Sequence, residues 1–304
     1  MSCTSPNFAL DLGVVDGKRR IKFLPRRMDS YSLHTLEEKY GKEYILQLPC
    51  GRCTSCLLNY ARTWAVRCCL EASLYKNNYF VTLTYDDDHY PKSSSSARRD
   101  VQLFFKRLRK EFPGVRYFGC LERGQHTQRY HHHVILFNLD LVDCVPLGKR
   151  SLEGYYYKSA VLHRIWSNGF IDIGDVSFNS CGYIARYCMK KRYQKSSDEF
   201  IYMSTKPGIG LGWLEKHIDT CIKYDEIYFN FGNFNKAKLP RYFDKHLEKV
   251  DPEAVEQMKR QRISNANLSS FADLIRYGLV YREELYSQKS DQIDKKVKLL
   301  KRGM

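Results

Sequence analysis

The sequence predicts an α+β fold, in which an antiparallel sheet carries helices on one face. Between residues 78 and 193, segments rich in β-branched and aromatic residues alternate with segments of helical period. Their order is strand, helix, strand, strand, helix, strand, helix. Two of the strands follow each other directly and are joined by a short polar segment, as in an antiparallel hairpin. This order is typical of the α+β class.

A helix is predicted over residues 57–75, because apolar residues recur at helical spacing and no proline interrupts them. Residues 78–91 are β-branched and aromatic, end in an acidic turn, and predict a strand. A polar, serine-rich linker is predicted over residues 93–99. The next helix, residues 100–112, begins at a capping Asp100 and has a basic face. Its apolar stripe consists of Val101, Phe104, Phe105 and Leu108.

The second half of the core begins with two strands, residues 115–123 and 131–139, which form the predicted hairpin. A helix over residues 159–169 follows, and then a strand over residues 170–178. A last helix is predicted over residues 179–193. The sequence thus predicts that the core is complete before residue 200.

Three domains are predicted from these elements. Residues 61–200 form the core, and residues 1–60 lack a sustained period, so they are predicted to be an irregular, cysteine-rich module. Residues 201–304 are predicted to be a basic, mainly helical extension. In that extension residues 206–213 read as a loop, and an Asp-Pro-Glu sequence starts a helix at residues 251–262.

The charge balance indicates a polyanionic partner. Fifty Lys and Arg against 34 Asp and Glu give a net charge of +16, and nucleic acid is the leading candidate. No segment has the pattern of a signal peptide or the ~20 apolar residues of a membrane span. We therefore expect a cytoplasmic protein without a membrane partner, whose 11 cysteines are mostly reduced.

Basic residues gather on two predicted helices. The basic face of the helix over residues 100–112 and the end of the helix over residues 179–193 are expected to contact DNA phosphates, so that binding should fall steeply with salt. The predicted DNA-binding residues are Lys106, Arg107, Arg109, Lys191 and Arg192.

Three consecutive histidines stand at the start of an apolar strand in the segment RYHHHVILF, residues 129–137. Because successive side chains of a strand point to opposite faces, His131 and His133 share one face and His132 points to the other. Glu122 lies on the neighbouring strand of the predicted hairpin, so its carboxylate is expected near the two imidazoles. Two imidazoles and one carboxylate leave coordination positions open, as a metal needs in order to polarise a substrate oxygen.

The ion expected for a phosphate substrate at this site is Mg²⁺ or Mn²⁺. The sequence leaves other interpretations open. The histidines are also consistent with ordinary hydrogen-bonded residues, and the glutamate with an exposed carboxylate at a strand end. Rival carboxylates follow an earlier strand, although three adjacent acids there are typical of a solvated turn. These rivals are Asp86, Asp87 and Asp88.

The segment YIARYCMK presents two phenols and an ammonium group along one helical stripe. Tyr183, Tyr187 and Lys190 stand at i, i+4 and i+7. A phenol with a pKa of about 10 is a poor nucleophile at neutral pH, but a polarised phosphate and a nearby cation would relieve that. The alternative is that the tyrosines are packing residues.

A cysteine motif lies outside the predicted core. Cys50, Cys53 and Cys56 form C-x₂-C-x₂-C, and Cys3 could loop back to supply a fourth thiolate. Four thiolates predict structural zinc, Zn²⁺ in a tetrahedral site. An iron–sulfur cluster and plain reduced thiols remain as alternatives.

The segments FVTLTY (residues 80–85), YHHHVILF and YIARYCMK resemble, in this order, the three motifs of the HUH endonucleases of rolling-circle replication. The resemblance is closest to the two-tyrosine initiators of gokushoviruses, which are small single-stranded DNA bacteriophages. It extends over most of the chain, to the segments PCGRCTSCLLNYARTWAVRC, DVQLFFKRLRK, KPGIGLGW and KLPRYF.

The resemblance implies an HUH, RRM-like nuclease core and a metal-dependent, site-specific DNA nickase. It implies that His131, His133 and Glu122 bind the metal, which polarises the scissile phosphate. Tyr183 or Tyr187 would attack to give a 5′-phosphotyrosine bond and a free 3′-OH that primes synthesis. After one round the other tyrosine would attack the regenerated junction and release a closed circle. The sequence does not show which tyrosine attacks first.

By the same resemblance, Lys190 would stabilise the transition state. The implied partners are the replication origin of a circular DNA, as double-stranded replicative form and as single strand, and a host helicase and DNA polymerase in the bacterial cytoplasm. One departure from the family pattern is His132, because the residue between the two ligands is usually a bulky hydrophobe.

Two other hypotheses remain at this stage. A non-catalytic, single-stranded nucleic-acid-binding protein with a zinc module would explain the charge and the 23 Tyr and 16 Phe as stacking platforms. A plasmid initiator or a conjugative relaxase would use similar chemistry, and only the wider resemblance argues against those two. The ordered motifs favour the nickase, because stacking requires neither His-x-His on a strand nor the stripe of tyrosines and lysine.

Overall fold

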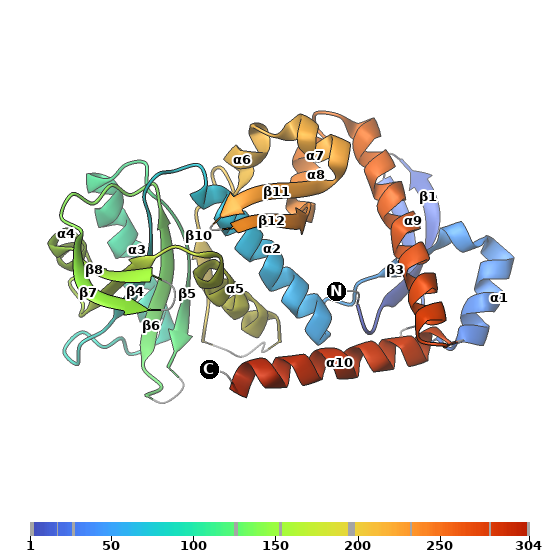
Figure 1. Cartoon of the computed structure of the whole chain (residues 1–304), viewed down its shortest axis with the longest axis horizontal. Coiled ribbons are helices and arrows are strands. Elements are labelled where there is room, and N and C mark those ends of the chain that lie inside the picture. The colour runs from blue at the N-terminus through green and yellow to red at the C-terminus, as the bar shows by residue number, and fades with distance from the viewer. Residues whose placement is uncertain are drawn as a thin grey trace. The chain divides into compact units, whose positions relative to one another are not determined.

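The computed structural model separates the chain into two compact units (Figure 1). One unit comprises Met1–Asn59 and Lys259–Met304, and the other comprises Tyr60–Met258. The predicted domain division at residues 60 and 200 stays a prediction. The residues that the structure describes are 3–16, 18–25, 28–124, 127–151, 154–193, 198–231, 233–279 and 281–302.

A seven-stranded antiparallel sheet forms the centre of the larger unit and confirms the predicted α+β class. The predicted hairpin is present as β5 and β6, which are neighbours in the sheet. The strand order is β10-β5-β6-β4-β9-β8-β7. The strands are β4 (Asn78–Thr84), β5 (Arg116–Arg123), β6 (Tyr130–Phe137), β7 (Val145–Ser151), β8 (Gly154–Lys158), β9 (Ile171–Asp175) and β10 (Ile201–Met203).

Helices cover both faces of this sheet, whereas the sequence predicted one face. Along β6, Ile135 and Phe137 belong to one hydrophobic core, and Val134 and Leu136 belong to a second. A strand that is apolar on both faces must be covered on both, because either face left open would expose hydrophobic surface. The first core takes α2 (Thr54–Ala72) and α5 (Phe178–Tyr193), and the second takes α3 (Ser94–Glu111) and α4 (Ala160–Trp166).

The predicted linker over residues 93–99 is wrong, because it forms the start of α3. The Ser93 side chain caps the helix by accepting a hydrogen bond from the backbone N–H of Ser96. Ala97 in the same stretch is fully buried in the core. The serine run therefore supplies a cap and a first turn, and Asp100 lies inside the helix rather than at its start.

Residues 1–60 are not irregular as predicted. They contain a three-stranded sheet of order β2-β1-β3 and a helix that begins with a hydrogen bond from Ser32 N to the Asp29 side chain. The pattern is hard to read because the second half of β1 is exposed, with Leu12 54% and Val14 71% accessible. These elements are β1 (Asn7–Val15), β2 (Lys18–Phe23), α1 (Ser30–Tyr40), a 3₁₀ turn (Lys42–Tyr44) and β3 (Ile45–Leu48).

The chain beyond residue 200 adds a hairpin and several helices. The helix that was predicted to end near residue 262 continues to Arg276, and a further helix follows it. None of the helices in the described part of the chain has the length and apolar character required to cross a membrane. The elements are α6 (Leu211–Glu215), α7 (Ile218–Tyr224), β11 (Glu226–Phe231), β12 (Asn233–Lys238), α8 (Arg241–Leu247), α9 (Pro252–Arg276) and α10 (Arg282–Arg302).

Two segments of the resemblance, KPGIGLGW and KLPRYF, pack against α2. The Arg67 guanidinium lies between the rings of Trp64 and Tyr242, 4.1 and 3.9 Å from their centroids. Its Nε also donates to the carbonyl of Ile209 at 3.0 Å. A side chain on Gly208 would collide with the Tyr242 hydroxyl, so the close approach requires glycine there. These two segments therefore hold α2 in place.

A buried ion pair completes this anchor. The carboxylate of Glu71, which is 1% exposed, pairs with Arg116 of β5 and accepts the backbone N–H of Gly210 at 2.6 Å. Arg116 also donates to the carbonyl of Pro207 at 2.7 Å. Because both partners of the buried pair find further hydrogen bonds, their desolvation is compensated. The network joins α2, the sheet and the KPGIGLGW segment.

Candidate active site

The two outer histidines of the HHH segment share one face of β6, as the period of a strand predicts. Strand pairing places His131 directly opposite Glu122 of β5. Both His131 Nε2 and His133 Nε2 face the same carboxylate oxygen, Glu122 Oε2, at 3.4 and 3.3 Å. Glu122 is 3% exposed and His133 is 7% exposed. One nitrogen from each histidine and one carboxylate oxygen lie within 4.8 Å of one another.

The outer ring nitrogens of these histidines have hydrogen-bond partners that orient the rings. His131 Nδ1 lies 3.3 Å from the carbonyl of Arg129, and a carbonyl can only accept, so Nδ1 carries the proton. His133 Nδ1 lies 3.2 Å from Thr82 Oγ1, on the strand that pairs with β6. Such partners are typical of metal-binding histidines, whose other nitrogen then offers its lone pair to the ion.

Burial favours the form of His133 that binds a metal. Desolvation lowers the pKa of His133 below its ordinary value, and the adjacent Glu122 only partly opposes this. The imidazole is therefore neutral near pH 7, which is the ligating form. Two neutral imidazoles and one carboxylate make a donor set that fits a divalent cation and fills only part of its coordination shell.

His132 points to the opposite face of β6, into the second core. It is fully buried, with Nε2 3.1 Å from the Tyr85 hydroxyl and Nδ1 3.1 Å from the Tyr202 hydroxyl. Burial first, and the two neighbouring histidines second, lower the pKa of His132 to about 3. The ring is therefore neutral and joins two tyrosine hydroxyls. This polar role accounts for a histidine where the family pattern has a hydrophobe.

The rival carboxylates after β4 are engaged elsewhere. Asp86 accepts the backbone N–H of His89 at 2.9 Å, and Asp87 pairs with Arg129 at 2.7 Å. Within the described ranges, the residue groups that could hold a metal do not include residues 86–88. The geometry thus favours Glu122 as the third donor.

Helix α5 brings one tyrosine to the histidines. The Tyr183 hydroxyl lies 3.5 Å from His133 Nε2, and the two rings meet edge to face at 5.1 Å between centroids. Phe80 of β4 packs against both rings. The Arg186 guanidinium lies over the Tyr183 ring, 5.4 Å from its centroid. A phenol, a cation and the donor set therefore meet in one place.

Tyr187 and Lys190 lie further along α5, at the predicted helical spacing. Their side chains are outside the described part of the structure, as are those of Lys191 and Arg192. The stripe of two phenols and one ammonium group therefore stays a prediction beyond Tyr183.

Sequence reasoning missed Phe80, Thr82 and Arg186. Phe80 and Thr82 share one face of β4 by the period of a strand, and the FVTLTY segment was already identified. What the sequence lacked was the pairing of β4 with β6, which places Thr82 opposite His133. Arg186 follows Tyr183 by three residues, so the helical period could have identified it.

The predicted DNA-binding residues of α3 are at least partly exposed, but α3 covers the face of the sheet opposite to the donor set. Arg107 donates to Ser167 Oγ at 3.1 Å, and Arg109 lies over the Tyr117 ring. Lys106 is exposed on the same helix. Contacts from these residues to DNA stay a prediction.

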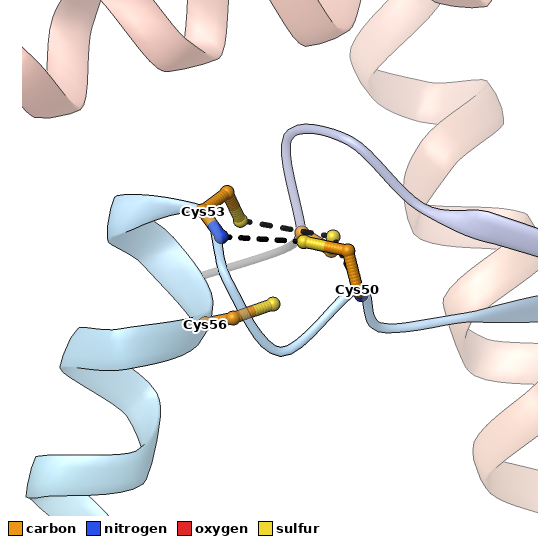
Figure 2. A group of neighbouring side chains, drawn as sticks. Cys50, Cys53 and Cys56 are labelled. Carbon is orange, nitrogen blue, oxygen red and sulfur yellow. Dashed lines mark hydrogen bonds between the residues drawn. The ribbon is translucent and has the colours of Figure 1, made fainter. Parts of the chain in front are cut away.

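The four predicted zinc ligands meet in the smaller unit. The sulfur atoms of the described group lie within 4.8 Å of one another, and Figure 2 shows three of the side chains converging. The four residues are Cys3, Cys50, Cys53 and Cys56.

Comparison with known proteins gives one family and several relatives. The model of the ORF2-type family of replication-associated proteins matches residues 78–192, which include the donor set and α5 up to Arg192. The replication-associated protein VP4 of Bdellovibrio phage phiMH2K is 30% identical over 266 residues, which is 79% of this chain and 84% of that protein.

Two further relatives carry similar descriptions. The replication-associated protein ORF2 of Spiroplasma virus 4 is 32% identical over 227 residues, 69% of this chain and 71% of that protein. The replication-associated protein ORF4 of Chlamydia phage 1 is 26% identical over 230 residues, 69% of this chain and 55% of that protein. No solved structure matches the chain significantly.

Proposed function

The chain belongs to the family of replication-associated proteins of small phages, and from this premise we propose that it is a metal-dependent HUH endonuclease. It would nick and rejoin DNA to initiate and terminate rolling-circle replication of a small circular genome. The observation that carries this proposal is the Tyr183 hydroxyl, 3.5 Å from a histidine of a donor set that fits a divalent cation.

His131, His133 and Glu122 would hold Mg²⁺ or Mn²⁺, which supplies Lewis-acid polarisation of the scissile phosphate. The protein's own part is positioning. Thr82 and the Arg129 carbonyl orient the two imidazoles, and the buried strands keep all three donors in fixed places. A rigid arrangement of this kind reduces the entropy lost when substrate and nucleophile are brought together.

The covalent step exchanges one phosphodiester bond for another. A tyrosine oxygen attacks phosphorus, the bond from phosphorus to the 3′ oxygen breaks, and the strand's 5′ phosphate remains on the tyrosine. The phenol loses one proton and the departing 3′ oxygen gains one, so protons balance. Because the bond energy is conserved in the phosphotyrosine, rejoining requires no nucleotide triphosphate. The free 3′-OH can then prime synthesis.

Two nucleophiles on one helix would let the enzyme start and finish a round. Tyr183 and Tyr187 are four residues apart, and residues at this spacing share a helical face. One tyrosine would make the first nick and the other would attack the regenerated junction. Lys190, one turn further along, would stabilise the charge that develops on the phosphate.

The substrate would be the replication origin of a circular phage genome, as double-stranded replicative form and as single strand. A helicase and a DNA polymerase of the bacterial host would extend the primer in the cytoplasm. The net charge of +16 supports a polyanionic substrate, because its field raises the local concentration of DNA.

The proposal is tested by incubating the protein with the complete supercoiled genome of its own phage, with Mn²⁺ or with EDTA. We expect a denaturant-resistant protein–DNA adduct that requires metal and has a blocked 5′ end. The Tyr183→Phe, Tyr187→Phe double variant should form none. Tyr224→Phe, at an exposed tyrosine of α7, is the matched control and should form adduct like the wild type.

Two outcomes would overturn the proposal. An adduct that persists in the double variant would place the nucleophile elsewhere. Tight binding to the genome without any adduct, in the presence of Mn²⁺, would favour a non-catalytic nucleic-acid-binding protein.

A further inference from the structure

The topology of the smaller unit brings four cysteines to one place. Strands β1 and β3 pair antiparallel, with Asn7 opposite Leu48, so the residues before β1 and after β3 lie at the same end of the sheet. Cys3 and Cys50 are those residues. Cys53 immediately precedes α2, and Cys56 lies in its first turn.

The distances between the sulfur atoms fit one tetrahedral ion. Cys3 Sγ and Cys53 Sγ are 3.8 Å apart, and one sulfur from each cysteine lies within 4.8 Å of the others. Bonds of about 2.3 Å from zinc to sulfur place tetrahedral ligands about 3.8 Å apart. A disulfide would require about 2.05 Å, and all four residues are free thiols.

Backbone N–H groups point at two of these sulfur atoms. Cys3 Sγ accepts the N–H of Cys50 at 3.3 Å. Cys50 Sγ accepts the N–H groups of Arg52 and Cys53 at 3.4 and 3.3 Å (Figure 2). Gly51 has a φ of 72°, a left-handed conformation that turns the chain back toward Cys50 Sγ. Donors directed at sulfur stabilise thiolate, the form that binds metal.

We propose that Cys3, Cys50, Cys53 and Cys56 hold one zinc ion with a structural role. Four thiolates complete the tetrahedral shell of zinc and leave no position for a substrate, which distinguishes a structural from a catalytic site. An iron–sulfur cluster distributes its cysteines over two or more irons, so the sulfur atoms would lie further apart than around one ion.

The ion would compensate for a small core. The fully or nearly buried apolar side chains of the described residues before α2 are few, and half of β1 is exposed. Small units of this kind commonly depend on a metal or on disulfides for stability. Zinc would join the start of β1, the segment after β3 and the first turn of α2. The buried apolar residues are Phe8, Ala9, Leu10, Leu33 and Leu46.

The test is native mass spectrometry of the full-length protein, purified without added metal. We expect one zinc ion per chain, released when the thiols are modified with an organomercurial and detected with a chromogenic chelator. To separate this ion from any bound at the histidines, the same measurement is made on the His131→Ala, His133→Ala double variant. That variant should retain one zinc ion.

Cysteine variants then locate the ion. Cys50→Ser should lower the zinc content at least tenfold, whereas Cys144→Ser, at a partly exposed cysteine outside the group, should leave it unchanged. Should Cys50→Ser fail to fold, cobalt replacement in the wild type decides. Four thiolates give Co²⁺ intense visible bands and a thiolate-to-cobalt charge-transfer band in the ultraviolet.

Several results would overturn the inference. These are wild-type protein without zinc, zinc that survives thiol modification, iron with acid-labile sulfide in the purified protein, or a mass that shows disulfides among the four cysteines. Cobalt spectra without thiolate charge transfer would also contradict it.

Discussion

Two residue groups among the described residues could hold a metal ion, and they differ in most respects that decide what the ion would do. The group on the central sheet has two imidazoles and one carboxylate, which leave coordination positions open beside the phenol of Tyr183. The group in the smaller unit has four thiols, and backbone N–H groups rather than a nucleophile surround it. An open shell suits catalysis and a closed shell suits structure.

The two groups also arise from the sequence in different ways. The sheet group depends on pairing between strands, because Glu122 and His131 meet only in the register of β5 and β6. The thiol group depends mainly on a short turn around Gly51, with one long-range partner in Cys3. A metal site that is spread over a rigid sheet can hold its donors fixed without the ion. A site in a small unit is expected to need the ion in order to form.

The largest effect is expected from His131→Ala and His133→Ala. Each removes one of two imidazole donors, so adduct formation should fall to background, by about 100-fold or more, which exceeds the typical loss from a residue that only orients a ligand. DNA affinity, measured by filter binding, should change little, because it depends on charge. Retained adduct formation in both variants would remove the sheet group from the mechanism.

Brief chelation should separate the two groups in one sample. Treatment with EDTA is expected to abolish adduct formation, and added Mn²⁺ should restore it. Zinc content, measured by mass spectrometry after the same treatment, should stay at one ion per chain, because four thiolates hold zinc more tightly than a partly filled shell holds Mn²⁺. If adduct formation recovers only when zinc is added, the division of roles between the groups is wrong.

A smaller effect is expected from Thr82→Val, which removes the hydroxyl beside His133 Nδ1. Loss of such a partner typically costs roughly 10–100-fold in metal affinity. The concentration of Mn²⁺ for half-maximal adduct formation should therefore rise by about that factor, with little change at saturating Mn²⁺. Thr84→Val is the matched control, since the Thr84 hydroxyl donates to the Phe170 carbonyl instead. Equal shifts in both variants would deny Thr82 an orienting role.

The smallest effect on the chemistry is expected from His132→Leu. This ring faces the second core, so adduct formation at saturating Mn²⁺ should be retained. Stability should fall by about 1–3 kcal/mol, because the hydroxyls of Tyr85 and Tyr202 lose a buried partner. The midpoint of urea unfolding measures this loss. A folded variant that forms no adduct would contradict the assignment of His132 to the far face.

Local periods predicted the parts of the site that lie within one element. The alternation along β6 placed His131 and His133 together and His132 apart, and the helical pattern placed Tyr183 on α5. Adjacent strands with a short connection made the position of Glu122 predictable as well. Register between strands that are distant in sequence is not encoded locally, so the contact from Thr82 to His133 could not be predicted.

The failures in predicting the fold have similar causes. Residues 93–99 resemble a linker in composition, and only the burial of Ala97 against the sheet shows why the helix starts at Ser94. The half-exposed strand β1 lacks the alternation that marks a strand with one buried face. Helices on one face were predicted because the order of elements does not reveal how many helices each face receives.

The most direct test of the proposed chemistry is to locate the covalent bond. The adduct formed with the phage genome and Mn²⁺ is digested with nuclease and protease, and the peptide that retains a nucleotide is sequenced by tandem mass spectrometry. We predict a 5′-linked nucleotide on Tyr183 or Tyr187, within α5. A nucleotide on a serine, or on a tyrosine outside α5, would contradict the assignment of α5 as the nucleophilic helix beside the histidines.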